Sequence, residues 1–127
     1  MSDAEPIWIH RGALLAIHDR LLADYGGPAG LRDEALLDSV LERPKQKWRY
    51  EHADIFTLAA AYAFGLAKNH AFIDGNKRIA FMAAYIFLSR NGYDLEAEEA
   101  DVVIAVTSLA AGTMTENEFA AWLERHC

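Results

Sequence analysis

The sequence predicts an all-α domain, and three observations support this prediction. Apolar residues recur with a period near 3.6 in several segments, residues that favour helix starts precede these segments, and glycine or proline follows them. The chain has 127 residues, the size of one ordinary domain, so we assign residues 1–127 to a single unit. We therefore expect a compact helical bundle that forms around a central buried helix.

The first part of the chain is predicted to contain one short strand and two helices. We expect the strand at residues 7–9 and the first helix over Arg11–Tyr25, which glycine and proline follow at once. Asp33 is predicted to cap the second helix, and Pro44 is predicted to end it, because the residue before a proline disfavours helical backbone. Residues 44–53 are therefore expected to form a polar loop.

The rest of the chain is predicted to form four further helices. Asp54 is expected to cap the third helix, and the fifth covers residues 97–111. The fourth runs over residues 76–91, and its apolar residues surround the helix axis, so we assign it as the central buried helix. Thr115 and Glu118 have the spacing of a capping box and begin the sixth.

Composition and charge exclude several classes of protein. Hydrophobic residues make up 53% and charged residues 24%, which is typical of a globular domain. A net charge of −7 argues against a protein that binds nucleic acid by neutralising phosphates. No apolar stretch approaches the roughly 20 residues of a membrane span, and the N-terminus lacks the basic and apolar regions of a signal peptide. Cys127 is the only cysteine, so we predict a cytoplasmic protein without disulfides or a Cys-based zinc site.

The segment between the third and fourth predicted helices carries the residues that point to chemistry. It reads His70-Ala71-Phe72-Ile73-Asp74-Gly75-Asn76-Lys77-Arg78. Phe72 and Ile73 are expected to anchor this segment in the core. An Asp-Gly dipeptide is typical of a turn, and Asn76 is predicted to cap the fourth helix.

Four side chains of this segment together predict a phosphate-transfer site. Lys77 and Arg78 place two cations in the first turn of a helix, where they oppose the helix dipole, and a bound phosphate would remove that conflict. His70 is suited to accept a proton near neutral pH, and Asp74 is suited to hold Mg²⁺ beside a polyphosphate. The alternative for each residue taken alone is structural: a core histidine, a turn aspartate and two solvent-exposed cations.

The nine residues of this segment resemble the signature of the Fic/Doc family, and specifically that of its death-on-curing (Doc) toxins, His-x-Phe-x-Asp/Asn-Ala/Gly-Asn-Lys-Arg. The resemblance extends to residues 17–19, 25–27, 31–33 and 88–93. It implies an all-α Fic fold that binds ATP and Mg²⁺. It further implies that His70 is the general base, that Asp74 holds Mg²⁺, and that four residues bind and stabilise the phosphates, with Lys77 and Arg78 acting on the transferred group: Gly75, Asn76, Lys77 and Arg78.

The Doc form of the signature implies a protein kinase that phosphorylates a threonine of elongation factor Tu, arrests translation and is inhibited by a Phd-type antitoxin. Fic adenylyltransferases instead carry glycine at the position of Lys77 and a second arginine at the position of Phe81. We therefore expect an ATP-dependent Ser/Thr kinase toxin. The alternatives are an adenylyltransferase on the same scaffold and a catalytically inactive binding module.

Two further expectations concern the surroundings of the site. By the same resemblance, residues 44–53 lie where the family has a flap that pairs with an extended target segment. Trp48 and Tyr50 are expected either to pack on that target or to anchor the segment in the core. The remaining histidines have no companion motif and are interpreted as surface or packing residues: His10, His18, His52 and His126.

Overall fold

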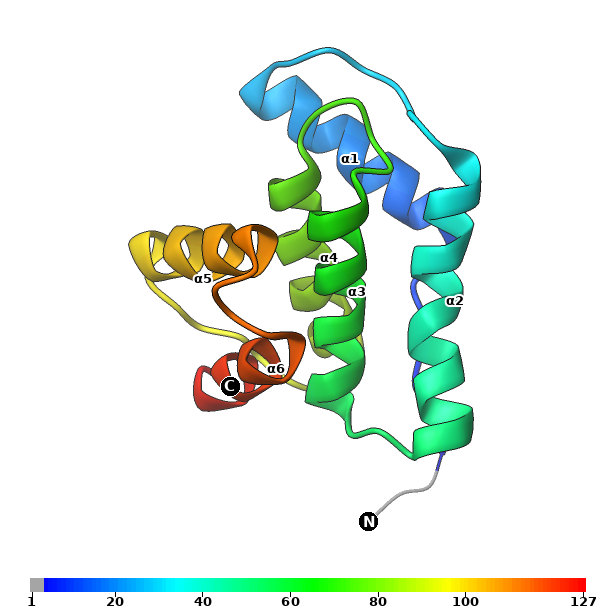
Figure 1. Ribbon diagram of the computed structural model, residues 1–127, viewed down its shortest axis with the longest axis vertical. Helices are drawn as coiled ribbons and strands as arrows, with labels where there is room; N and C mark the ends of the chain where they lie inside the picture. Colours follow the sequence, from blue (N-terminus) through cyan, green and yellow to red (C-terminus); the bar gives the residue numbers. More distant parts are fainter. Residues whose placement is uncertain (1–3) are drawn as a thin grey trace.

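The computed structural model describes residues 4–127, and within them the chain forms six helices (Figure 1). Their bounds are α1 Arg11–Tyr25, α2 Glu34–Glu51, α3 Ile55–Asn69, α4 Asn76–Arg90, α5 Glu99–Ala111 and α6 Glu116–Arg125. The all-α prediction is confirmed. Within the described residues no helix has the length and apolarity that crossing a membrane requires.

The central helix of the bundle is α3, which packs against α2, α4, α5 and α6. Nine of its fifteen residues are buried, and five of these are alanines that allow the neighbouring backbones to approach closely. The assignment of the central position to α4 is therefore wrong. One side of α4 remains accessible, because Phe81, Met82 and Ile86 are only partly buried and Tyr85 is exposed.

Helix α2 continues through Pro44 and ends at Glu51, so the predictions that Pro44 ends it and that residues 44–53 form a loop are both wrong. Tertiary contacts outweigh the missing N–H of the proline. Trp48 packs on the core with its ring centroid 6.2 Å from that of Trp8, which confirms its anchoring role. Tyr50, by contrast, is 79% exposed. Because this segment is helical, the flap expected there is absent from it.

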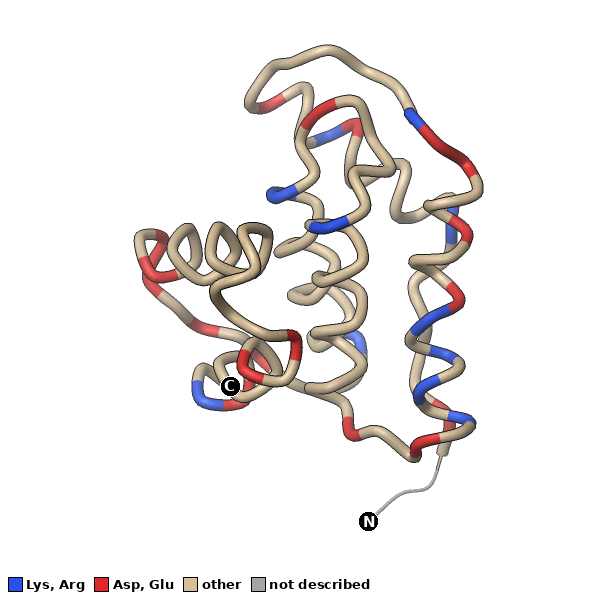
Figure 2. Tube along the Cα trace, in the orientation of Figure 1, with Lys and Arg blue, Asp and Glu red and all other residues tan. Residues whose placement is uncertain are grey.

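Ion pairs also support the second half of α2. Figure 2 shows acidic positions along the first half of this helix and mostly basic positions along its second half. Arg49 lies 3.3 Å from Glu42, so this pair spans the turn that contains the proline. Arg43 donates to both carboxylate oxygens of Glu116, at 2.7 Å from Nη1, and its guanidinium lies over the Phe64 ring. The pair with Glu116 fixes the start of α6 against α2.

The predicted caps are confirmed where they depend on local sequence. Asp33 accepts a hydrogen bond from the Leu36 N–H at 3.1 Å, and Asp54 accepts one from the Thr57 N–H at 2.8 Å. Both hydrogen bonds of the capping box between Thr115 and Glu118 are present.

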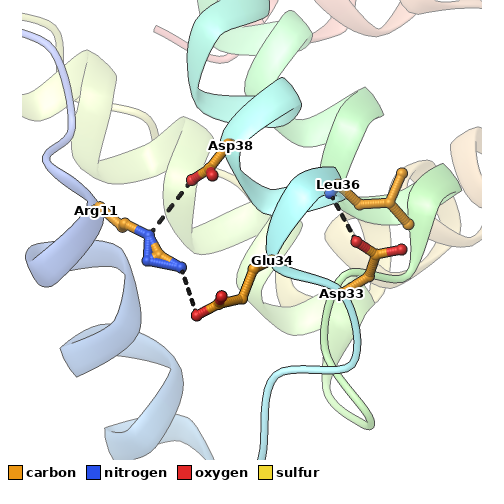
Figure 3. Close-up of polar contacts among 5 residues, drawn as sticks. All are labelled: Arg11, Asp33, Glu34, Leu36 and Asp38. Carbon is orange, nitrogen blue, oxygen red and sulfur yellow. Dashed lines mark hydrogen bonds and ion pairs between the residues drawn. The ribbon is translucent and has the colours of Figure 1, made fainter.

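Ion pairs and hydrogen bonds attach the N-terminal part of the described chain to the bundle. Arg11 joins the start of α1 to the start of α2, at 3.3 Å from Glu34 and 3.4 Å from Asp38 (Figure 3). Ile7 lies in the segment before α1. Its N–H donates to the side-chain oxygen of Asn91, and its carbonyl oxygen accepts from the side-chain nitrogen of Asn91. The strand expected at residues 7–9 does not form, because these backbone groups bind side chains instead of a second strand.

Candidate active site

The predicted site lies on the motif loop, residues 70–75, which connects α3 to α4. This loop pairs with the connection between α1 and α2, residues 26–33. An antiparallel bridge joins Leu31 to Phe72, and the Ile73 N–H donates to the Gly30 carbonyl oxygen at 3.1 Å. Two segments that are distant in sequence therefore lie side by side at this end of the bundle (Figure 1).

Asn76 closes the motif loop from inside. It is only 7% exposed, and its side-chain amide donates to the Phe72 carbonyl oxygen at 2.9 Å and accepts from the Phe72 N–H at 3.1 Å. The N-cap is Gly75, with a left-handed φ of 77°, so the prediction of Asn76 as the cap is wrong by one residue. Phe72 is buried as predicted, whereas Ile73 is 53% exposed and does not anchor the loop in the core.

His70 is the C-cap of α3, is exposed, and has a left-handed φ of 51°. Its carbonyl oxygen accepts a hydrogen bond from Nε of Arg32 at 2.6 Å, and the Asn69 carbonyl oxygen accepts one from Nη2 of the same arginine at 2.9 Å. Arg32 thus satisfies carbonyls that the end of a helix leaves without partners. Sequence reasoning assigned no role to this arginine.

The Asp74 side chain is exposed and lies beside the glycine-rich connection between α1 and α2. Its Oδ1 accepts a hydrogen bond from the Gly75 N–H at 2.8 Å. A Cβ atom placed on Gly27 would be only 2.3 Å from Oδ2, and Gly27 itself has a φ of +113°. Only glycine therefore leaves room for the carboxylate in this position.

Lys77 and Arg78 are exposed in the first turn of α4, and among the described residues neither forms an ion pair with an acidic side chain. The guanidinium of Arg78 lies 4.4 Å from the ring centroid of Tyr25, the last residue of α1. Within residues 4–127 no backbone oxygen accepts from the N–H groups of residues 76–78. This end of α4 therefore presents free N–H donors and two cations, which is the composition of an anion site.

His18, interpreted from the sequence as a surface or packing residue, is buried beside the motif loop, and its contact with that loop was not predicted. It is 2% exposed, its ring stacks on that of Phe72 with centroids 3.7 Å apart, and its Nε2 lies 2.7 Å from the Asp74 carbonyl oxygen. The signal that could have revealed its burial is its spacing, four residues after the buried Leu14 on α1. Its partner in the loop has no sequence signal.

These features define a class of protein: an all-α domain in which the connection between two helices carries an exposed histidine and carboxylate, and the helix that follows begins with two cations and free N–H groups. The chain belongs to the Fic/DOC family, whose model matches residues 8–88. The match includes α1 and the motif loop, and it confirms the resemblance found in the sequence.

Two relatives align with the chain. It is 33% identical over 115 residues to a protein of Escherichia phage P1 named Protein kinase doc, covering 88% of this chain and 89% of the relative. It is 43% identical over 77 residues to a protein of Mycolicibacterium smegmatis named Toxin Doc, covering 58% of each chain.

Proposed function

We propose that this protein is the toxin of a toxin–antitoxin system and acts as an ATP-dependent protein kinase on a serine or threonine of a translation factor. The observation that carries the proposal is that His70, Asp74, Lys77 and Arg78 are all exposed on the nine residues that run from the end of α3 into the first turn of α4. The names of the two relatives, Protein kinase doc and Toxin Doc, support the same function.

The start of α4 suits the phosphates of ATP. The free N–H groups of residues 76–78 and the side chains of Lys77 and Arg78 offer donors and positive charge at one point. Gly75 presents no side chain there, so a phosphate can approach the backbone. Because the Asn76 amide already binds the Phe72 backbone, Asn76 contributes its own N–H and the shape of the loop.

The donor set also fits Mg²⁺. Asp74 is an exposed carboxylate next to the anion site, and Mg²⁺ in nucleotide sites takes one or two carboxylates together with phosphate oxygens and water. When bound, the ion supplies charge neutralisation for the phosphates. Asp74 is the side chain that would hold it.

We assign His70 the role of general base. The target hydroxyl oxygen forms a bond to the γ-phosphorus while the bond between that phosphorus and the β–γ bridging oxygen breaks, and ADP leaves. The hydroxyl proton passes to the His70 ring, which is exposed and carries no hydrogen bond in the described structure. Lys77 and Arg78 stabilise the charge on the transferred group, so positioning and electrostatics supply the catalysis.

Two residues favour γ-phosphate transfer over transfer of AMP. Lys77 occupies the position at which Fic adenylyltransferases have a glycine, and its side chain would fill space meant for the α-phosphate. Phe81 occupies the position of their second arginine, and a partly buried apolar ring packed near Tyr85 cannot bind phosphate. An adenylyltransferase is therefore the second candidate, and an inactive binding module the third.

The family resemblance supports elongation factor Tu as the substrate and a Phd-type antitoxin as the inhibitor, and action on that factor would take place in the cytoplasm. The decisive experiment incubates elongation factor Tu with the protein, Mg²⁺ and ATP labelled on either the γ- or the α-phosphate. We expect the γ-label alone to move to the factor, and His70→Ala to abolish the transfer. Transfer of the α-label would favour the adenylyltransferase, and transfer of neither would reject both enzyme hypotheses for this substrate.

A further inference from the structure

His18 occupies a place where an apolar side chain would ordinarily pack. Its ring is 2% exposed and stacks on Phe72 at an interplanar angle of 20°. A buried imidazole is unfavourable unless its polar atoms find partners. Nε2 has one, the Asp74 carbonyl oxygen at 2.7 Å, and because a carbonyl only accepts, Nε2 carries the proton.

The carbonyl that His18 binds belongs to the peptide group that joins Asp74 to Gly75. A peptide group is planar, so fixing the direction of its C=O also fixes the direction of its N–H on the opposite side. That N–H donates to Oδ1 of the Asp74 carboxylate at 2.8 Å. A continuous path of two hydrogen bonds through one rigid plane therefore connects the buried histidine of α1 to the exposed carboxylate of the motif loop.

We propose that His18 is a positioning residue that orients the Asp74 carboxylate through the peptide group between Asp74 and Gly75. The proposal rests on the proposed function only for what the carboxylate does, which is to hold Mg²⁺ beside the nucleotide. The contact is close: a Cβ on Gly75 would lie 3.4 Å from Nε2 of His18. The orientation of this peptide is thus set from α1 and not by the loop alone.

Two substitutions separate the hydrogen bond from the packing. His18→Phe keeps a ring that can stack on Phe72 but removes the donor. His18→Gln keeps an N–H donor near the position of Nε2 but removes the ring. His126 provides a matched control, because its Nδ1 also lies 2.7 Å from a backbone carbonyl, that of Trp122 on α6, away from the motif loop. His126→Phe should change neither readout below.

The first readout needs no nucleotide. Amide hydrogen exchange of the Gly75 N–H should be about tenfold faster in His18→Phe than in the wild type, the factor that corresponds to the loss of one ordinary hydrogen bond. His18→Gln should stay within about twofold of the wild type on the same scale. The melting temperature should show the opposite order, with His18→Phe above His18→Gln, because the phenylalanine retains the stacking.

The second readout is the ratio of the ATP dissociation constants measured without and with Mg²⁺ by calorimetry. This ratio should fall about tenfold in His18→Phe and little in His18→Gln. Equal losses in both variants, or losses that follow the melting temperatures, would reduce His18 to a packing residue. If wild-type ATP affinity does not depend on Mg²⁺, the metal part of the proposed function fails, while hydrogen exchange still decides the role of His18.

Discussion

Nε of Arg32 donates a hydrogen bond to the carbonyl oxygen of His70 at 2.6 Å, across 38 positions of sequence. The same guanidinium binds the Asn69 carbonyl oxygen, and the Arg32 N–H donates to the Ala71 carbonyl oxygen at 2.7 Å. Three consecutive residues at the end of α3 are thus held by one arginine. The left-handed backbone of His70, which sets where its ring can point, is part of this arrangement.

We expect Arg32→Met to slow target phosphorylation about tenfold or more while leaving the ATP affinity within about twofold of the wild type. The reason is that Arg32 holds the backbone of the proposed base and does not contact the start of α4. Steady-state kinetics and calorimetry would measure the two quantities. Arg20→Met, which removes an exposed arginine that pairs with Asp24, is the control. A loss of ATP affinity as large as the loss of rate would contradict the interpretation that Arg32 acts by holding the backbone of His70.

Tyr25 should affect ATP binding through Arg78. Tyr25→Ala removes the ring below the guanidinium, and an exposed cation–π contact of about 0.5–1 kcal/mol corresponds to a dissociation constant raised roughly two- to fivefold. Tyr25→Phe keeps the ring and should bind ATP like the wild type. Calorimetric titration would compare the three proteins. Equal affinities of Tyr25→Ala and Tyr25→Phe would show that the ring does not position Arg78 for phosphate.

Asp74→Asn should weaken the binding of Mg-ATP much more than that of ATP without the metal. The amide is similar in size but lacks the charge that a hard cation prefers. Calorimetric titrations with and without Mg²⁺ would measure both affinities. Losses of equal size in the two titrations would leave Asp74 with a role in the turn only.

Asn76→Ala should destabilise the protein by about 2–3 kcal/mol, because it leaves the buried N–H and C=O of Phe72 without their partners. Urea unfolding would measure the free energy. Asn117→Ala, at an exposed position of α6, should change stability by less than about 0.5 kcal/mol. A small effect at Asn76 would mean that the loop reforms these hydrogen bonds with water.

The buried Tyr62 should give the protein an alkaline stability limit. Burial raises the pKa of Tyr62 to about 12 from 10.0, although the hydrogen bond that its oxygen accepts from the Ile9 N–H lowers the pKa. Because the pKa is higher in the folded state than in the unfolded state, the neutral Tyr62 hydroxyl does not reduce the free energy of unfolding below pH 10. That free energy falls as the pH rises toward 12, by up to about 1.4 kcal/mol per pH unit. Unfolding measured from pH 8 to 11.5 should show this loss in the wild type and a shallower one in Tyr62→Phe. The same dependence of the free energy of unfolding on pH in both proteins would contradict this role of Tyr62.

The elements that were predicted well are those that local sequence determines. The bounds of α1, the caps Asp33 and Asp54 and the capping box of Thr115 depend on residues within one turn of each other. The position of the motif before α4 follows from the same kind of signal. A nine-residue sequence therefore located the candidate site.

The predictions that were wrong concern residues whose state depends on distant parts of the chain. Pro44 remains inside α2 because Trp48 and the ion pair to Glu116 stabilise the helix on both sides of it. His18, interpreted as a surface or packing residue, is a packing residue because the motif loop, far along the chain, packs on it. Its spacing from Leu14 indicates burial, but the contact with the loop leaves no periodic signal in the sequence, and neither do the contacts around Pro44.

Two of the hydrogen bonds that shape the motif loop join residues far apart in sequence: His18 and Asp74 are separated by 56 positions, and Arg32 and His70 by 38. Contacts of such long range form only when the chain between them has collapsed, since closing the intervening loops costs entropy that packing must offset. A chain still emerging from the ribosome, or one that has partly unfolded, therefore has the motif residues without their geometry. The ability to act on a target would arise in a single step with the native bundle, and loss of the bundle would remove it as abruptly.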